Sequence, residues 1–105
     1  MDFISAVPGE LRAPEAVSAI VAEPGIPGHV RLSFLPSLRA SAYGIELSPG
    51  AGLPFEHFAT VHDTVADLEL TPGATVRIRV KASNAAGQAA PSPVVEVAVP
   101  VAAAA

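Results

Sequence analysis

The sequence predicts an all-β fold, a Greek-key sandwich of about seven short strands. Apolar and polar residues alternate in several short runs, which is the pattern of strands with one face buried and the other in water. Eleven prolines and eight glycines fall largely between these runs, where they turn the chain. No stretch has a helical period. In a chain of 105 residues these features favour one domain made of strands and turns.

The first half of the chain contains three expected strands. Residues 17–21 are apolar except for Ser18 and precede the turn cluster at 24–28. Val30, Leu32 and Phe34 alternate with polar residues until Pro36 closes the strand. The third strand, at 43–47, ends at a Ser-Pro-Gly turn.

The second half of the chain contains four more expected strands. Residues 55–61 are expected to form a short edge strand, and 64–70 the strand after it. The clearest alternation follows a Pro-Gly turn in the expected strand 74–84, where every second residue from Val76 to Ala82 is apolar. The last expected strand is 94–99. The apolar phases predict a core made of Val30, Leu32, Phe34, Tyr43, Ile45, Leu47, Leu70, Val76, Ile78 and Val80.

Several segments of the sequence occur in the order and at the spacing of a known family pattern. The turn Leu70-Thr71-Pro72-Gly73 precedes the long strand, and Ala82, Asn84 and Gly87 follow at its end. Tyr43-Gly44-Ile45 opens the third strand. These segments resemble fibronectin type III domains over residues 14–100, which implies an immunoglobulin-like sandwich. The chain departs from the family pattern at Phe34, where the family has a core Trp, and at Val76, where it has a corner Tyr.

The resemblance also implies a role. We interpret residues 1–13 as a leader or linker and 101–105 as a tail or linker. Such domains act as non-catalytic interaction or spacer modules. The richness in Ala, Pro and Gly suggests a GC-rich bacterial source, and the resemblance implies that in bacteria such modules often accompany secreted carbohydrate-active enzymes or surface proteins. The alternative is a stand-alone structural protein that self-associates through an edge strand.

Charge and composition limit the partners. The net charge of −4 argues against nucleic acid, and no apolar run is long enough to span a membrane. The start of the chain lacks the pattern of a signal peptide. The absence of cysteine excludes disulfides and thiolate sites. We expect an unidentified protein or carbohydrate partner, and a monomer or weak dimer.

A basic stripe is one candidate surface. Arg77, Arg79 and Lys81 lie on the outer phase of one strand and make up half of the six Lys and Arg residues. They could attract an anionic partner. The favoured interpretation is an exposed charge ladder against Glu46 and Glu96 on neighbouring strands.

The second candidate surface is an aromatic pair, Phe55 and Phe58, on the expected edge strand. Because the two are three residues apart, one ring should face outward and could contact a partner. A local bulge that turns both rings into the core is the alternative, and it is marginally favoured.

Catalytic and metal sites are not expected. The sequence has no nucleophile elbow, phosphate-binding loop, zinc-protease motif or dinucleotide motif. His57 and His62 fall on opposite faces of an extended strand, and His29 is remote from both. We therefore predict no catalytic residue, no cofactor and no metal.

Overall fold

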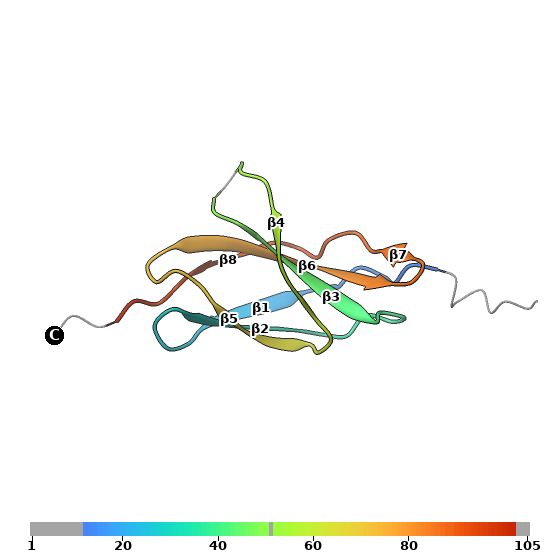
Figure 1. Ribbon diagram of the computed structural model, residues 1–105, viewed down its shortest axis with the longest axis horizontal. Coiled ribbons are helices and arrows are strands. Elements are labelled where there is room, and N and C mark those ends of the chain that lie inside the picture. Colours follow the sequence, from blue (N-terminus) through green and yellow to red (C-terminus); the bar gives the residue numbers. More distant parts are fainter. Residues whose placement is uncertain (1–11, 51, 103–105) are drawn as a thin grey trace, which may run out of the picture.

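The computed structural model describes residues 12–50 and 52–102, which form two antiparallel sheets packed face to face (Figure 1). One sheet has the order β1-β2-β5 and the other β4-β3-β6-β7, with β8 also paired to β6. Because the chain crosses repeatedly between the sheets, the predicted Greek-key sandwich is confirmed. The strands of the described ranges are β1 (Ile20–Pro24), β2 (His29–Phe34), β3 (Ala42–Ser48), β4 (Glu56–Val61), β5 (Val65–Glu69), β6 (Thr75–Asn84), β7 (Gly87–Gln88) and β8 (Val95–Ala98).

The core lies between the two sheets and consists of aliphatic side chains with one aromatic pair. The ring of Phe34 exposes 8% of its surface and meets Tyr43 edge-on, with the ring centroids 4.9 Å apart. Each large side chain buried in this way contributes roughly 1.5–3 kcal/mol. The core prediction is confirmed at Val30, Leu32, Phe34, Tyr43, Ile45, Ile78 and Val80.

Three of the predicted core residues are only half-buried. Leu47, Leu70 and Val76 pack against the core without being enclosed by it. The side chains that complete the core were not in the prediction. They are Val17, Ile20, Leu68, Ala82, Val97 and Val99.

The first strand lies three residues later than predicted, at Ile20–Pro24 and not at 17–21. The prediction was wrong because Pro24 was taken as part of the turn. In the structure Pro24 is the last residue of β1 and lies opposite Val30. β1 is an edge strand of its sheet, where a residue without an N–H group can be accommodated.

The hairpin after β6 contains a short strand, β7, which is not among the strands expected from the sequence. Asn84 closes this turn, because its Oδ1 atom accepts a hydrogen bond of 2.8 Å from the Ala86 N–H. Its Nδ2 atom donates to the carbonyl oxygens of Arg12, at 2.8 Å, and Arg39, at 3.1 Å. One side chain thus fixes the turn and ties down the first described residues of the chain.

Between β7 and β8 the chain follows β6 without forming a regular strand. Pro91 and Pro93 have no N–H group to donate. Ser92 lies between them, and its N–H donates to the Val80 carbonyl at 2.9 Å. The Ser92 hydroxyl oxygen accepts from the Val80 N–H, also at 2.9 Å. A side chain therefore replaces a backbone acceptor at this point of the sheet.

The two ends of the described chain lie at opposite ends of the sandwich (Figure 1). The entry is held beside the β6–β7 turn by Asn84, as described above. At the exit, the Pro100 carbonyl accepts from the Gly28 N–H and the Val99 carbonyl accepts from the Gly73 N–H, each at 3.0 Å. Gly73 has a φ of 86°, a conformation that favours glycine in this turn. The described residues include no helix long and apolar enough to cross a lipid bilayer.

Candidate functional site

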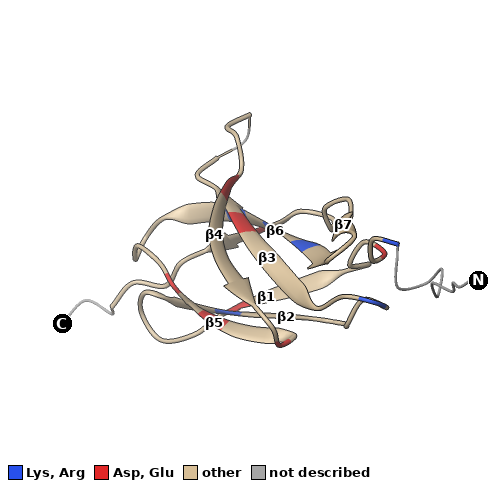
Figure 2. Cartoon of the chain, turned by 45° about the vertical axis from the view of Figure 1, so that its right-hand side comes forward, with Lys and Arg blue, Asp and Glu red and all other residues tan. Residues whose placement is uncertain are grey.

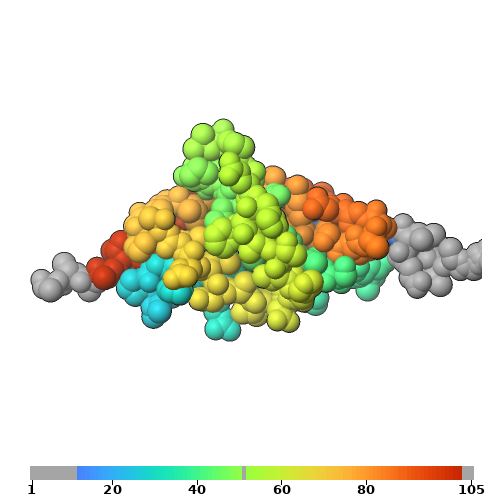
Figure 3. Space-filling model, viewed as in Figure 1, coloured from blue at the N-terminus to red at the C-terminus, as the bar shows by residue number. Residues whose placement is uncertain are grey.

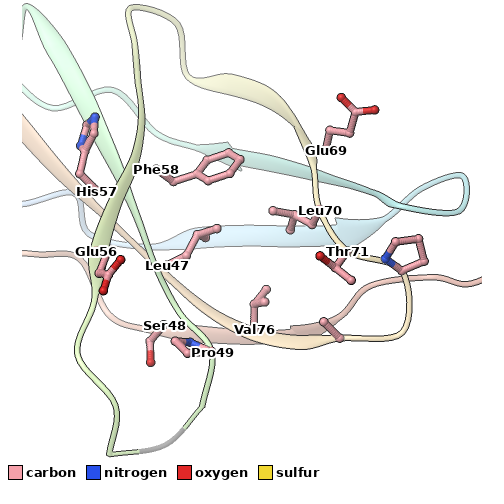
Figure 4. A pocket seen from close by; sticks show the side chains of 12 residues that line it. Leu47, Ser48, Pro49, Glu56, His57, Phe58, Glu69, Leu70, Thr71 and Val76 are labelled. Atoms are coloured by element: carbon pink, nitrogen blue, oxygen red, sulfur yellow. The ribbon is translucent and has the colours of Figure 1, made fainter.

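A groove opens on the side of the sandwich between β4 and the β5–β6 turn (residues 70–74). Its volume is about 760 Å³. Figure 4 shows the side chains that line it, which come from the end of β3, the start of β4, the end of β5, the turn after it and the start of β6. We call it the β4 groove. Its lining residues are Leu47, Ser48, Pro49, Glu56, His57, Phe58, Glu69, Leu70, Thr71, Pro72, Ala74 and Val76.

A β-bulge sets the shape of this groove. Along β3, Ile45 is paired with Ala59 of β4, but the next residue, Glu46, is paired with His57. Phe58 is therefore the extra residue of the bulge, which redirects its side chain. The Phe58 ring points into the groove (Figure 4) and exposes 42% of its surface.

The aromatic pair of the sequence prediction is split by this bulge. Phe55 lies against the outer face of the sheet, with the guanidinium carbon of Arg79 4.2 Å from its ring centroid. Phe58 lies in the β4 groove on the other side. The structure contradicts the alternative in which a bulge turns both rings into the core, since Phe55 lies on the outer face. One ring is exposed to solvent, as the first alternative expected, and it is Phe58. A contact between this ring and a partner stays a prediction.

The floor of the groove is apolar. Leu47, Leu70 and Val76, which the sequence places in the core, form it and remain half-buried. The fibronectin pattern has a tyrosine where Val76 stands, and the smaller valine leaves more open space. The groove is therefore a part of the core that no strand of the described chain covers.

The rim of the groove is acidic. Glu56 and Glu69 are exposed carboxylates, and none of the lining residues is Lys or Arg. Figure 3 shows the β3–β4 hairpin projecting from the surface beside this region. His57 lies on the rim with its Nε2 atom 3.2 Å from the Thr60 hydroxyl. The groove thus offers an apolar floor and negative charge, without a cation.

The basic stripe lies on the outer face of the other strands of this sheet. Glu46 of β3 and Glu96 of β8 flank it, so red and blue segments adjoin in Figure 2. Arg79 Nε is 2.6 Å from Glu46 Oε1, Lys81 Nζ is 3.6 Å from Glu46 Oε2, and Arg77 Nε is 3.9 Å from Glu96 Oε2. The basic stripe therefore forms a charge ladder with Glu46 and Glu96, the two carboxylates expected from the sequence.

The stripe is not as exposed as predicted. The side chains of Arg79 and Lys81 expose only 26% and 24% of their surface. Long side chains on a central strand are covered by their neighbours on both sides, and here Phe55 also covers Arg79. Because Glu46 already pairs with two of the cations, the stripe offers little free positive charge to an anionic partner.

The titration of Glu46 is clearly perturbed by its surroundings. Partial burial raises its pKa, but the hydrogen bond from Arg79 and the charges of Arg79 and Lys81 outweigh that effect. The pKa of Glu46 is therefore lower than its ordinary value of 4.5. Because the folded state favours the charged form, the ladder stabilises the protein at neutral pH.

The three histidines each have a separate partner. His29 Nδ1 is 2.8 Å from an Asp67 carboxylate oxygen, and His62 Nδ1 is 3.1 Å from the Ser41 carbonyl. His57 contacts Thr60, as described above. Within residues 12–50 and 52–102, no three His, Asp or Glu side chains gather as metal ligands.

No protein-family model and no curated protein sequence matches the chain. Several solved structures do. The twitchin kinase region from C. elegans (Fn31-NL-kin-CRD-Ig26) is 25% identical with a TM-score of 0.78, covering 85% of this chain and 17% of that one. The sixth fibronectin type III domain of the human fibronectin type III domain containing protein 3 is 16% identical, with a TM-score of 0.72 and coverage of 88% and 91%.

An Fn3-like protein from Clostridium thermocellum is 17% identical, with a TM-score of 0.69 and coverage of 90% of this chain and 99% of that one. The chain spans only a small part of the larger structures it matches, such as 33% of the A168-A170 segment of titin. The sheets and their strand order define an immunoglobulin-like β-sandwich. Within that class the chain has the fibronectin type III fold, which confirms the resemblance seen in the sequence. Domains of this kind are generally non-catalytic linker or interaction modules in multidomain proteins.

Proposed function

We propose that the domain is a spacer or interaction module of a longer, extracellular or surface-attached bacterial protein. The observation that carries this proposal is the placement of the two chain ends at opposite ends of the sandwich (Figure 1). A domain with this arrangement holds whatever precedes it and whatever follows it at a fixed separation.

The attachments at both ends support a rigid spacer. Asn84 binds the entry of the chain through the Arg12 carbonyl. At the exit, Val99 exposes only 3% of its surface, and its carbonyl accepts a hydrogen bond from Gly73. Both connections are made to the folded core, so neither end acts as a loose hinge within the described residues.

The spacing role is tested by placing the domain between two fluorescent proteins and measuring energy transfer between them. We expect a narrow distance distribution that shifts outward by a constant step when a second copy is inserted in series. The control is a Gly/Ser linker of equal residue number, whose end-to-end distance grows only with about the square root of length. A distribution as broad as that of the Gly/Ser control would contradict the spacer role.

The location and the partner class are proposals of the same kind. A net charge of −4 supports a protein or carbohydrate partner over nucleic acid. Sequencing the complete reading frame and fractionating the cells that express it would test the extracellular location. Recovery of the full-length protein in the cytosol would contradict it.

Self-association through β4 is the second candidate, because β4 pairs with β3 alone among the described strands and carries the partly exposed Phe58. We still expect a monomer or weak dimer, since the bulge at Phe58 interrupts the edge. Light scattering over a concentration series measures this, with Phe58→Ser as the test variant and Phe55→Ser as the control. A tight dimer that neither substitution changes would exclude β4 as the contact.

A further inference from the structure

We propose that the β4 groove binds an extended segment of another protein, one whose apolar side chains are flanked by Lys or Arg. This inference goes beyond the spacing role and can fail while that role stands. It rests on three features of the groove: an incompletely covered apolar floor, two unpaired strand edges, and an acidic rim without cations.

The floor is apolar surface that the fold does not cover. Leu47, Leu70 and Val76 have the sequence phase of core residues, but each is half-buried. Phe58, redirected by the bulge, leaves 42% of its surface in water beside them. A space of about 760 Å³ over such a floor is in the size range of ligand sites and can accept apolar side chains.

The strand edges determine the form of the partner. Among the described strands β4 pairs only with β3, and β5 pairs only with β2, so each has one free edge beside the groove. Free edges bind extended segments through their backbone N–H and C=O groups. The pairing of β5 has no register shift, so β5 offers the continuous edge, while the bulge of β4 turns Phe58 into the groove. Side chains alternate along an extended segment, so every second one would enter the groove.

The rim determines the charge of the partner. Glu56 and Glu69 are exposed, and the lining includes neither Lys nor Arg. Cationic side chains outside the groove would meet these carboxylates, while an acidic segment would be repelled. The net charge of −4 also disfavours a second copy of this chain as the occupant.

The test is an NMR titration of the ¹⁵N-labelled domain with a synthetic hexapeptide, acetyl-Lys-Val-Lys-Ile-Lys-Val-amide. We expect saturable shifts of the amides of β4 and of residues 69–72, with a Kd of about 1 mM or tighter. Raising the salt concentration should weaken the binding. A peptide with Glu in place of each Lys should not bind, and neither should one with Ser in place of each apolar residue.

Matched variants locate the site. Phe58→Ala should weaken binding about fivefold through the lost apolar contact, while Phe55→Ala on the outer face should not change it. Glu69→Gln should weaken binding by a factor of about two to five, the size of one exposed ion pair. Glu96→Gln makes the same change in charge away from the groove and should have no effect.

A charge swap keeps the test informative if Phe58→Ala does not fold. Glu69→Lys should bind the Glu-containing peptide better than the unchanged domain does. Any of the following results would overturn the proposal: no saturable shifts at about 1 mM peptide, shifts centred on the outer face of β6, equal binding of the Ser-containing peptide, or equal losses in the Glu96 and Glu69 variants. Peptide-independent shifts that grow with protein concentration would identify a second copy as the occupant and would also overturn it.

Discussion

Replacing Ser92 with alanine should destabilise the domain, although the substitution removes only one oxygen atom. Ser92 exposes 4% of its surface and Val80 exposes none. The Ser92 hydroxyl oxygen accepts a hydrogen bond of 2.9 Å from the Val80 N–H. Without the hydroxyl, the Val80 N–H is buried with no acceptor, which costs about 1–3 kcal/mol. The bond from the hydroxyl to the Pro93 carbonyl is also lost, but Pro93 is exposed and water can replace it. We expect a loss of about 2 kcal/mol.

Urea denaturation of the two proteins measures this difference. In thermal denaturation, each kcal/mol lost from the free energy of unfolding lowers the Tm of a domain of this size by about 4–8 °C. The Tm of Ser92→Ala should therefore be lower by roughly 10 °C. Hydrogen exchange at the Val80 amide gives a local readout, because this proton should exchange faster in Ser92→Ala than global stability alone requires.

Ser83→Ala is the matched control. Its hydroxyl is 3.4 Å from the Ala42 carbonyl, too long for a strong bond, so we expect a change within about 0.5 kcal/mol. If Ser92→Ala were as mild as Ser83→Ala, the side-chain bridge would not be what closes the sheet beside Pro91 and Pro93.

Two further predictions concern the core and the charge ladder. Phe34→Ala should cost about 3–5 kcal/mol in urea denaturation, because it leaves a cavity beside Tyr43; a loss under about 1.5 kcal/mol would contradict the placement of this ring in the core. Arg79→Met should lower stability at pH 7 by about 1 kcal/mol. Since the pKa of Glu46 is depressed, this contribution is present above pH 4.5 and is lost as the pH falls further and the carboxyl is protonated. If the difference in the free energy of unfolding between Arg79→Met and the unchanged domain stayed constant from neutral to acid pH, Glu46 and Arg79 would not act as a pair.

The fold could be predicted because its signals are local. Alternation at Val30, Leu32 and Phe34 depends only on which residues share a strand face, so it is visible in the sequence. The Pro72-Gly73 turn likewise depends on the conformations of adjacent residues. Where such a local rule had an exception, the prediction was wrong, as at Pro24, which an edge strand accepts.

The candidate site could be predicted only in part. The ladder partners of Arg79 and Arg77 followed from strand order, because strict alternation fixes which side chains share a face. Their half-buried state did not follow, since it depends on the neighbours that cover them. The separation of Phe55 from Phe58 depends on a bulge in the pairing of β4 with β3, and the register between two strands is set by their whole interface.

By itself, then, the sequence determined short amphipathic strands separated by turns, because these are consequences of residue order within single strands. The sandwich and the partners of the charge ladder came from the strand order that the fibronectin type III resemblance implies. Only the tertiary structure decided that Leu47, Leu70 and Val76 form the floor of an acidic-rimmed groove, and that Ser92 bonds to Val80. Both features join segments that are distant in the chain. Their geometry is set by how the sheets pack and where a strand bulges, which no local pattern of residues specifies.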